Sequence, residues 1–296
     1  MKKLLFVLLL LCVSTSSLYG CSKPNTEESM QSKKLVELYV NGLMPYKSPF
    51  PLLELEKNDS NLSTISYEPD DAVGYSLDLV KPSKYGFMHL ESIASSMSLK
   101  LGFPLSIYQR NKYARGIPSK EKGGYDWNAW MESSIETMKN FEAQQQIWVS
   151  SFELKQEKGV FVLLGSLDFS DTWNQDDLTN LRYSLFLKAD RIYYYYYNDE
   201  TGFVENLAYD MIPLLGDIKE EYDGIGFPLF SSSGEYPTKE KPSITLCTEP
   251  FTIPFIEGFT EEQQPNWSLH LILNDGTDMG KNLYSWSFPI KVEEES

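Results

Sequence analysis

Large apolar side chains alternate with polar ones in two stretches near the C-terminal end of the chain. The apolar positions are Trp267, Leu269, Leu271 and Leu273 in the first stretch, and Tyr284, Trp286, Phe288 and Ile290 in the second. A period of two indicates strands with one buried face, and Asn274-Asp275-Gly276 between them is typical of a turn. The pattern predicts an antiparallel hairpin, with Pro289 placing its second strand at an edge or bulge and His270 on the face opposite Leu269.

Four further segments have the composition of strands. They are Gln146–Leu154, Val160–Phe169, Leu181–Lys188 and Arg191–Tyr197. The first and the last connection, Gln156–Gly159 and Ala189–Asp190, are short enough for hairpins. We therefore expect a meander from Gln146 to Tyr197 at the centre of the sheet.

Helical spacing is clearest after Asp126, which can cap a helix. Apolar residues recur there at intervals of three and four, at Trp127, Met131, Ile135, Met138 and Phe141. A second amphipathic series runs through Leu207, Met211, Leu215, Ile218 and Tyr222, and Pro213 must kink or split it. Leu35–Met44 fits a helix and a strand equally well.

These elements predict an α+β fold, mainly an antiparallel β-sheet of at least six strands with a few helices packed on it. Two segments rich in Lys, Gly, Pro and Ser, Arg110–Gly124 and Ser231–Ser243, predict exposed loops. The first is a candidate boundary between an N-terminal lobe, residues 32–124, and a C-terminal α+β lobe, residues 125–296.

The first twenty residues have the three-part layout of a secretory signal peptide. Lys2 and Lys3 precede the apolar run Leu4–Val13, and the small or polar stretch Ser14–Gly20 follows. Ten apolar residues span about half of a ~30 Å hydrocarbon core, which is too short for a membrane helix. Residues 1–20 therefore predict a targeting segment and are excluded from the fold.

The end of this segment, Leu18-Tyr19-Gly20-Cys21, resembles the lipobox of bacterial lipoprotein precursors. The resemblance implies cleavage before Cys21, a diacylglycerol thioether on its sulfur and often an acylated amino group, and two or more acyl chains anchor a protein stably. Residues 21–31 would then form a flexible, lipidated tether. Ser22, in place of Asp, is similar to Gram-negative lipoproteins released to the outer membrane. The expected location is the bacterial cell envelope.

Composition narrows the choice of partners. The formal net charge is −16, or −18 once Lys2 and Lys3 leave with the signal, so nucleic acid is a poor partner. The acidity serves solubility or provides a docking face for a basic protein. Cys12 would leave with the signal and Cys21 would carry lipid, so Cys247 would be the one free cysteine and no intrachain disulfide could form. We expect Cys247 to be a small, buried side chain.

Motifs for catalysis are absent. The chain has two histidines, His89 and His270, and lacks the zinc, thiol, serine-hydrolase and phosphate-loop motifs. Ser119 and Lys122 have the S-x-x-K spacing without its partner motifs, and we interpret it as chance. We assign no catalytic residue, no cofactor and no metal ligand.

Two groups of residues remain as a candidate binding surface. An oxygen-rich cluster that calcium would favour contains Asp168, Asp171, Asp176 and Asp177, but it lacks glycine and the usual calcium-loop spacing, and turn capping is the commoner role. Aromatic residues run from Tyr193 through Tyr195 to Tyr197. That run fits a sheet covered on both faces, a sugar-stacking platform or a protein-binding strand.

The sequence thus favours a non-enzymatic, membrane-anchored lipoprotein that binds another protein in the periplasm or at the cell surface, and a basic protein is one candidate partner. Inhibitors of toxins or hydrolases, including immunity proteins of contact-dependent secretion systems, share this general build. One alternative is a hydrolase acting on envelope glycan or lipid, with its site among Asp168–Asp177 and the tyrosine run. Another is a ligand-binding or assembly lipoprotein.

Overall fold

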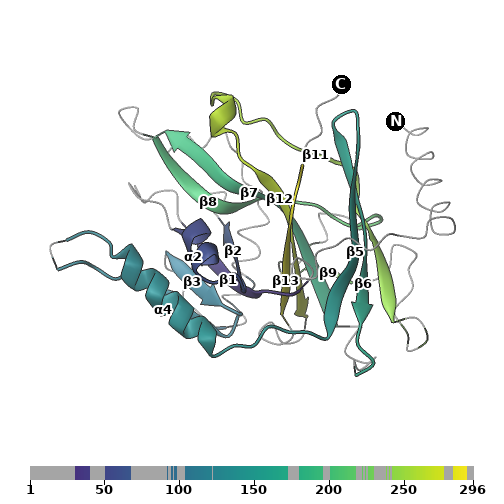
Figure 1. Cartoon of the computed structure of the whole chain (residues 1–296), viewed down its shortest axis with the longest axis horizontal. Coiled ribbons are helices and arrows are strands. Elements are labelled where there is room, and N and C mark those ends of the chain that lie inside the picture. The colour runs from purple at the N-terminus through teal and green to yellow at the C-terminus, as the bar shows by residue number, and fades with distance from the viewer. Residues whose placement is uncertain are drawn as a thin grey trace.

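The described part of the chain is dominated by β-strands (Figure 1). The computed structural model describes residues 31–40, 51–67, 92, 95, 97–98, 104–121, 123–172, 180–195, 201–217, 222, 224, 226–229, 238, 240, 242–276 and 283–291. Two α-helices are described over their whole length, α2 (Leu52–Asn58) and α4 (Trp127–Lys139). No helix within these ranges has the length and apolar character needed to cross a membrane. The broad α+β class is confirmed, with more sheet than the sequence predicted.

A large sheet of nine strands runs through the described residues. β9 (Phe227–Pro228) pairs with the start of β7, and the other strands follow the order β13 (Tyr284–Pro289), β12 (Trp267–Asp275), β7 (Leu181–Tyr195), β8 (Thr201–Met211), β2 (Leu62–Tyr67), β1 (Lys34–Tyr39), β3 (Leu105–Tyr108), β4 (Lys112–Arg115). The β1–β2 and β2–β8 pairs are parallel, so the sheet is mixed. Strands from both sides of residue 124 belong to it, and the lobe boundary there remains a prediction.

The large sheet curls, so that its edge strand β13 meets the start of β1. Lys33 N donates to Ser285 O at 2.9 Å, and Ser285 N donates to Ser32 Oγ at 3.1 Å. The predicted β12–β13 hairpin is confirmed, and β13 is an edge strand as Pro289 indicated. The expectation of one buried face in β12 was wrong, because the curl also encloses His270 and Ile272 on the opposite face.

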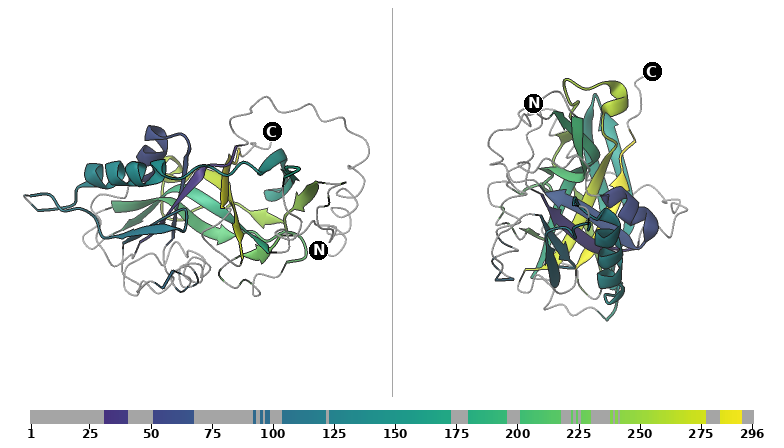
Figure 2. Two further views of the ribbon diagram at one scale, coloured as in Figure 1. Left: turned by 90° about the horizontal axis from the view of Figure 1, so that it is seen from below. Right: turned by 90° about the vertical axis from the view of Figure 1, so that its left-hand side faces the viewer.

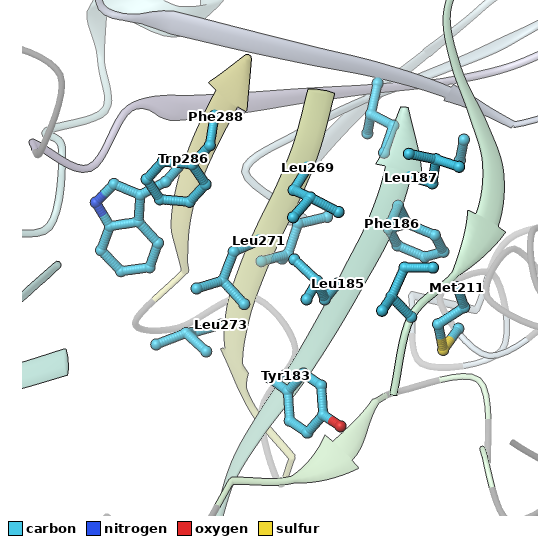
Figure 3. Close-up of a cluster of buried hydrophobic side chains, with 14 of the residues drawn as sticks. Tyr183, Leu185, Phe186, Leu187, Met211, Leu269, Leu271, Leu273, Trp286 and Phe288 are labelled. Carbon is cyan, nitrogen blue, oxygen red and sulfur yellow. The ribbon is translucent and has the colours of Figure 1, made fainter. Parts of the chain in front are cut away.

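A smaller sheet covers the outer face of β7, β12 and β13. It contains β5 (Ile147–Glu157), β6 (Val160–Phe169), β10 (Ser243–Cys247) and β11 (Phe251–Thr252). Phe152 of β5 stacks on Phe288 of β13 with ring centroids 4.0 Å apart. Figure 3 shows the apolar layer that the large sheet contributes, with Leu185, Leu271 and Trp286 on three neighbouring strands. The main hydrophobic core lies between the two sheets.

The predicted meander from Gln146 to Tyr197 was wrong. β5 and β6 form a hairpin in the small sheet, whereas β7 lies in the large sheet between β12 and β8. The connection predicted at Ala189–Asp190 is part of the single strand β7, because Ala189 pairs with both Trp267 and Leu207. These pairings join residues far apart in sequence, which a reading of local turn chemistry does not detect.

Helices α2 and α4 cover the face of β1–β3 that points away from the main core. The predicted start of α4 is confirmed, since Asp126 accepts a hydrogen bond from Ala129 N at 3.1 Å. Trp130 Nε1 donates to Ser106 Oγ at 3.2 Å, which places Trp130 and Ser134 on the buried side. The predicted apolar residues Trp127, Met131 and Ile135 consequently lie at the rim of this smaller core.

The helix predicted from Leu207 was wrong, because Leu207 and Met211 lie in strand β8. Their spacing of four is also a multiple of two, so it suits a strand. The ambiguous segment from Leu35 begins with strand β1, whose neighbours β2 and β3 satisfy its backbone. Cys247 is buried, as expected for a small apolar side chain.

Candidate functional site

The structure places the predicted site residues on different sheets. Asp168 lies in β6, opposite Trp148 and Ser243, and Asp171 is exposed just beyond that strand. Tyr193 lies near the far end of β7 in the large sheet. In Figure 1, β6 ends at the bottom of the view and β7 at the upper left. Cys21, Asp176, Asp177, Tyr197 and the side chain of Tyr195 lie outside the described residues.

The polar interior of the curl contains an ion pair. Arg110 donates to both carboxylate oxygens of Glu37 at 2.9 and 3.0 Å, and Tyr67 donates to the same carboxylate at 3.1 Å. Burial opposes a charge on Arg110, but the adjacent Glu37 raises the pKa of Arg110 above its usual value. All three side chains are fully buried, so this ion pair belongs to the core.

A Ser–His contact also lies inside the curl. Ser285 Oγ is 2.9 Å from His270 Nε2, the geometry of a nucleophile and its base. Burial lowers the pKa of His270 well below its usual value, with Lys188 acting in the same direction. Because Ser285 and His270 are both fully buried, a substrate has no access to them. Their contact ties β12 to β13.

A third polar cluster fills the gap where β2 and β8 meet at a single pair, Ser66–Leu207. Lys188 Nζ donates to Thr64 O at 3.3 Å and lies 3.8 Å from Glu56 Oε1. Burial lowers the pKa of Lys188, and Glu56 opposes that shift. Within the described ranges, no group of three or more His, Cys, Asp or Glu side chains has the geometry to hold a metal ion.

The exposed surface offers a different kind of site. Phe255 is 65% exposed, more than any other large apolar side chain of the described residues. It lies in the segment between β10 and β12, residues 249–266, which we call the Phe255 loop. The loop contains four glutamates and neither lysine nor arginine, and three of the glutamates are exposed: Glu257, Glu261 and Glu262.

The Phe255 loop is held by its own side chains. Gln264 Oε1 accepts from Ile256 N, and Gln264 Nε2 donates to Ile256 O, both at 2.8 Å. Thr260 and Gln263 form a capping box around the short 3₁₀ turn η5 (Glu261–Gln263). Ile256 is buried beneath the loop while its neighbour Phe255 is exposed. The backbone therefore holds Phe255 outward in a defined position.

The loop is also anchored to β7, the strand of the tyrosine run. Asn266 N and Asn266 Nδ2 donate to the two carboxylate oxygens of Asp190, each at 2.8 Å. The rings of Tyr193 and Phe259 are 6.1 Å apart, and those of Tyr193 and Phe203 are 5.6 Å apart. Tyr193 thus supports the Phe255 loop from below. Sequence reasoning missed Phe255, although Ile253-Pro254-Phe255-Ile256 is an apolar run outside any periodic segment.

Comparisons with known proteins bear on the fold alone. No family model and no curated protein matches the chain. Among solved structures, HBP35 of Porphyromonas gingivalis is similar, with a TM-score of 0.50 and 11% identity over 90% of this chain and 80% of that one. The protein AGR_C_4864 of Agrobacterium tumefaciens matches 90% of this chain and 99% of its own at 9% identity, with a TM-score of 0.47. At these identities, what the chain has in common with HBP35 is its fold.

Proposed function

We propose that the chain is a lipoprotein of a bacterial cell envelope, anchored to the membrane through Cys21, whose folded body binds a basic protein without catalysing a reaction. The observation that carries the proposal is the outward position of Phe255 on an acidic loop with a fixed backbone. The Phe255 loop is the contact that we assign to the partner. An inhibitor or immunity-type protein is the class that suits such a contact.

The energetics favour this assignment of the loop. Transferring a phenylalanine side chain from water to an apolar pocket contributes roughly 1.5–3 kcal/mol, and aromatic residues are common anchors in protein interfaces. Because Gln264 already holds the backbone at Ile256, little conformational entropy is lost on binding. The glutamates around Phe255 would attract a basic partner and speed association.

The polar groups in the interior are buried, which favours a role in the fold over a role in catalysis. Glu37, Arg110, His270 and Ser285 are the groups that most resemble catalytic machinery, and each is fully buried. Their hydrogen bonds are made to one another and to neighbouring strands. They stabilise the curl of the large sheet, and the surface that remains for function is the exposed one.

The proposal is tested by affinity capture of the anchored protein from intact cells. We expect the wild type to retain a basic protein that Phe255→Ser loses, and retention should weaken between low and physiological salt because long-range attraction is screened. Trp148→Ser is the matched control, since Trp148 is a 40% exposed aromatic residue on the small sheet. Equal capture by wild type and Phe255→Ser, or cleavage of peptidoglycan or phospholipid by the purified mature protein, would refute the proposal.

A further inference from the structure

A basic arm runs beside α4 and projects past the N-terminal end of that helix (Figure 2). It comprises residues 111–125, between β3 and α4, and includes β4. Apart from Ile117, its described residues are exposed. Figure 2 (left) shows the arm extending past the end of α4, along the longest axis of the molecule. The Phe255 loop lies at the top of Figure 1 and of the right-hand view in Figure 2, whereas α4 lies low in both.

The arm has an ordered backbone despite its exposure. Gly116 N donates to Pro104 O at 2.9 Å, and Asp126 N donates to Pro118 O at 2.7 Å. Ser119 and Tyr125 form an antiparallel bridge, closed by a hydrogen bond from Lys120 N to Gly124 O at 3.0 Å. These contacts hold the two sides of the arm together, so its backbone has a defined conformation.

The charge of the arm is opposite to that of the whole chain. The sequence of the arm contains four cationic residues and one acidic residue, Glu121, which gives it a net charge of +3 in a chain of −16. The cationic residues are Lys112, Arg115, Lys120 and Lys122. Two tyrosines stand among these cations, Tyr113 at 48% and Tyr125 at 43% exposure. The guanidinium of Arg115 lies 5.6 Å from the centre of the Tyr113 ring.

We propose that this arm is a contact for an anionic lipid surface. Each lysine or arginine close to an anionic leaflet strengthens binding about fivefold, and tyrosine is enriched where a protein meets the polar headgroups. The rest of the chain is acidic and would be repelled, but charges more than about 10 Å from the surface are largely screened at 0.1 M salt. Lys120 lies on the projecting part of the arm, and Lys112 and Arg115 lie behind it on β4, the edge strand of the large sheet, so the three cations follow one edge of the molecule and can approach a lipid surface together.

A lipid surface fits the arm better than an acidic protein does. A protein segment is recognised through pockets or grooves that fit its side chains, and the described residues of the arm are an exposed hairpin. A bilayer requires only exposed cations and amphipathic rings, and Lys112, Arg115, Tyr113 and Tyr125 provide these.

The use of this contact in the cell rests on the proposed lipid anchor. A tether of residues 21–31 spans at most about 40 Å when fully extended, so the body would stay close to the bilayer. Contact through the arm would then fix the orientation of the body relative to the membrane. Binding of the arm to lipid does not itself require lipid on Cys21.

The test measures vesicle binding by the mature chain, residues 21–296, carrying Cys21→Ser so that no acyl chain contributes. The probes are vesicles of phosphatidylcholine alone and of phosphatidylcholine with phosphatidylglycerol in equal parts. We expect binding to the second kind only, weakening as salt rises. Lys112→Gln/Arg115→Gln/Lys120→Gln should reduce the affinity about a hundredfold, by the fivefold effect of each cation.

A matched control removes the same charge elsewhere, through Lys57→Gln/Lys155→Gln/Lys158→Gln, and should bind nearly as wild type does. Tyr113→Ser/Tyr125→Ser should weaken binding while leaving its salt dependence unchanged. Thermal melting of each variant confirms that it is folded. The proposal is overturned if the wild type binds both kinds of vesicle equally, or if the control triple variant loses as much affinity as the arm variant. Either result overturns it even if an acidic protein is found to bind the arm. Neither the lipid anchor nor the Phe255 loop takes part in this vesicle binding. A negative result therefore leaves the proposed function unaffected.

Discussion

Arg110, in the turn after β3, donates two hydrogen bonds to Glu37 in the middle of β1, at 2.9 and 3.0 Å. Arg110 and the preceding Gln109 both have positive φ angles, near 48° and 47°. Such a backbone costs about 1–2 kcal/mol per residue for amino acids other than glycine. The tight turn is retained because it brings the guanidinium to Glu37 and lets Gln109 accept from Leu35 N at 2.7 Å.

Loss of one partner of this ion pair should destabilise the protein strongly. We expect Arg110→Met to lower the free energy of unfolding by about 3–5 kcal/mol, because an unpaired carboxylate stays buried. Glu37→Leu/Arg110→Met should recover most of that loss, since no buried charge remains. Urea unfolding of both variants measures this, and a double variant as unstable as the single one would contradict it.

His270 should make stability depend on pH. Burial, with help from Lys188 and Lys33 and against Glu37, lowers the pKa of His270 in the folded state. The unfolded chain therefore binds a proton below pH ~6.5 that the folded chain does not, and stability falls as the pH drops from there towards the folded pKa.

His270 changes the free energy of unfolding by at most about 1.4 kcal/mol per pH unit. Between pH ~6.5 and ~5, the wild type should lose up to about 1.6 kcal/mol more stability than His270→Gln, which cannot take up the proton. Chemical denaturation of both proteins across this range measures the difference. Parallel pH profiles would show that His270 is not the responsible group.

Gly226 should tolerate no side chain. Its φ is +140°, and an added Cβ would lie 2.6 Å from the carbonyl oxygen of Tyr183 in β7. Gly226→Ala should cost about 1–3 kcal/mol more than Gly159→Ala, because Gly159 also has a positive φ but open space around its Cα. Thermal or urea unfolding of the two variants decides the matter. Equal stabilities would mean that the segment carrying Gly226 can move away from β7.

Local signals predicted the elements that are local. The β12–β13 hairpin and the capped start of α4 depend on residues close in sequence, and both are confirmed. Leu207 was misassigned to a helix because a spacing of four suits both periodicities. In the sheet, β7 lies between β8 and β12. The pairing of Ala189 with Trp267 cannot be derived from the alternation of apolar and polar residues alone.

The candidate site likewise combines features that are evident in the local sequence with features that depend on tertiary packing. The side chain of Tyr193 was singled out from the sequence, but its contact with Phe259 results from tertiary packing. The Phe255 loop has no period, and its position depends on Gln264 and on the contact between Asn266 and Asp190, which are 76 residues apart. Its exposure became evident only once the fold was known.

Lipid attachment is predicted at Cys21. Cys21→Ser should leave uncleaved precursor and abolish labelling with palmitate, because the thioether requires sulfur and class-specific cleavage follows its formation. The precursor is distinguished from the mature protein by its size on a gel. Normal labelling of the variant would exclude the lipoprotein assignment.

The central claim is that Phe255 enters a pocket on a basic protein. A photoreactive amino acid placed at position 255 of the anchored protein, with irradiation of intact cells, tests it most directly. We predict one discrete crosslinked product containing a basic protein, whose yield falls as salt rises. The same residue at position 148, where the native tryptophan is 40% exposed, should not capture that protein. No protein product from position 255, or the same products from both positions, would contradict the account.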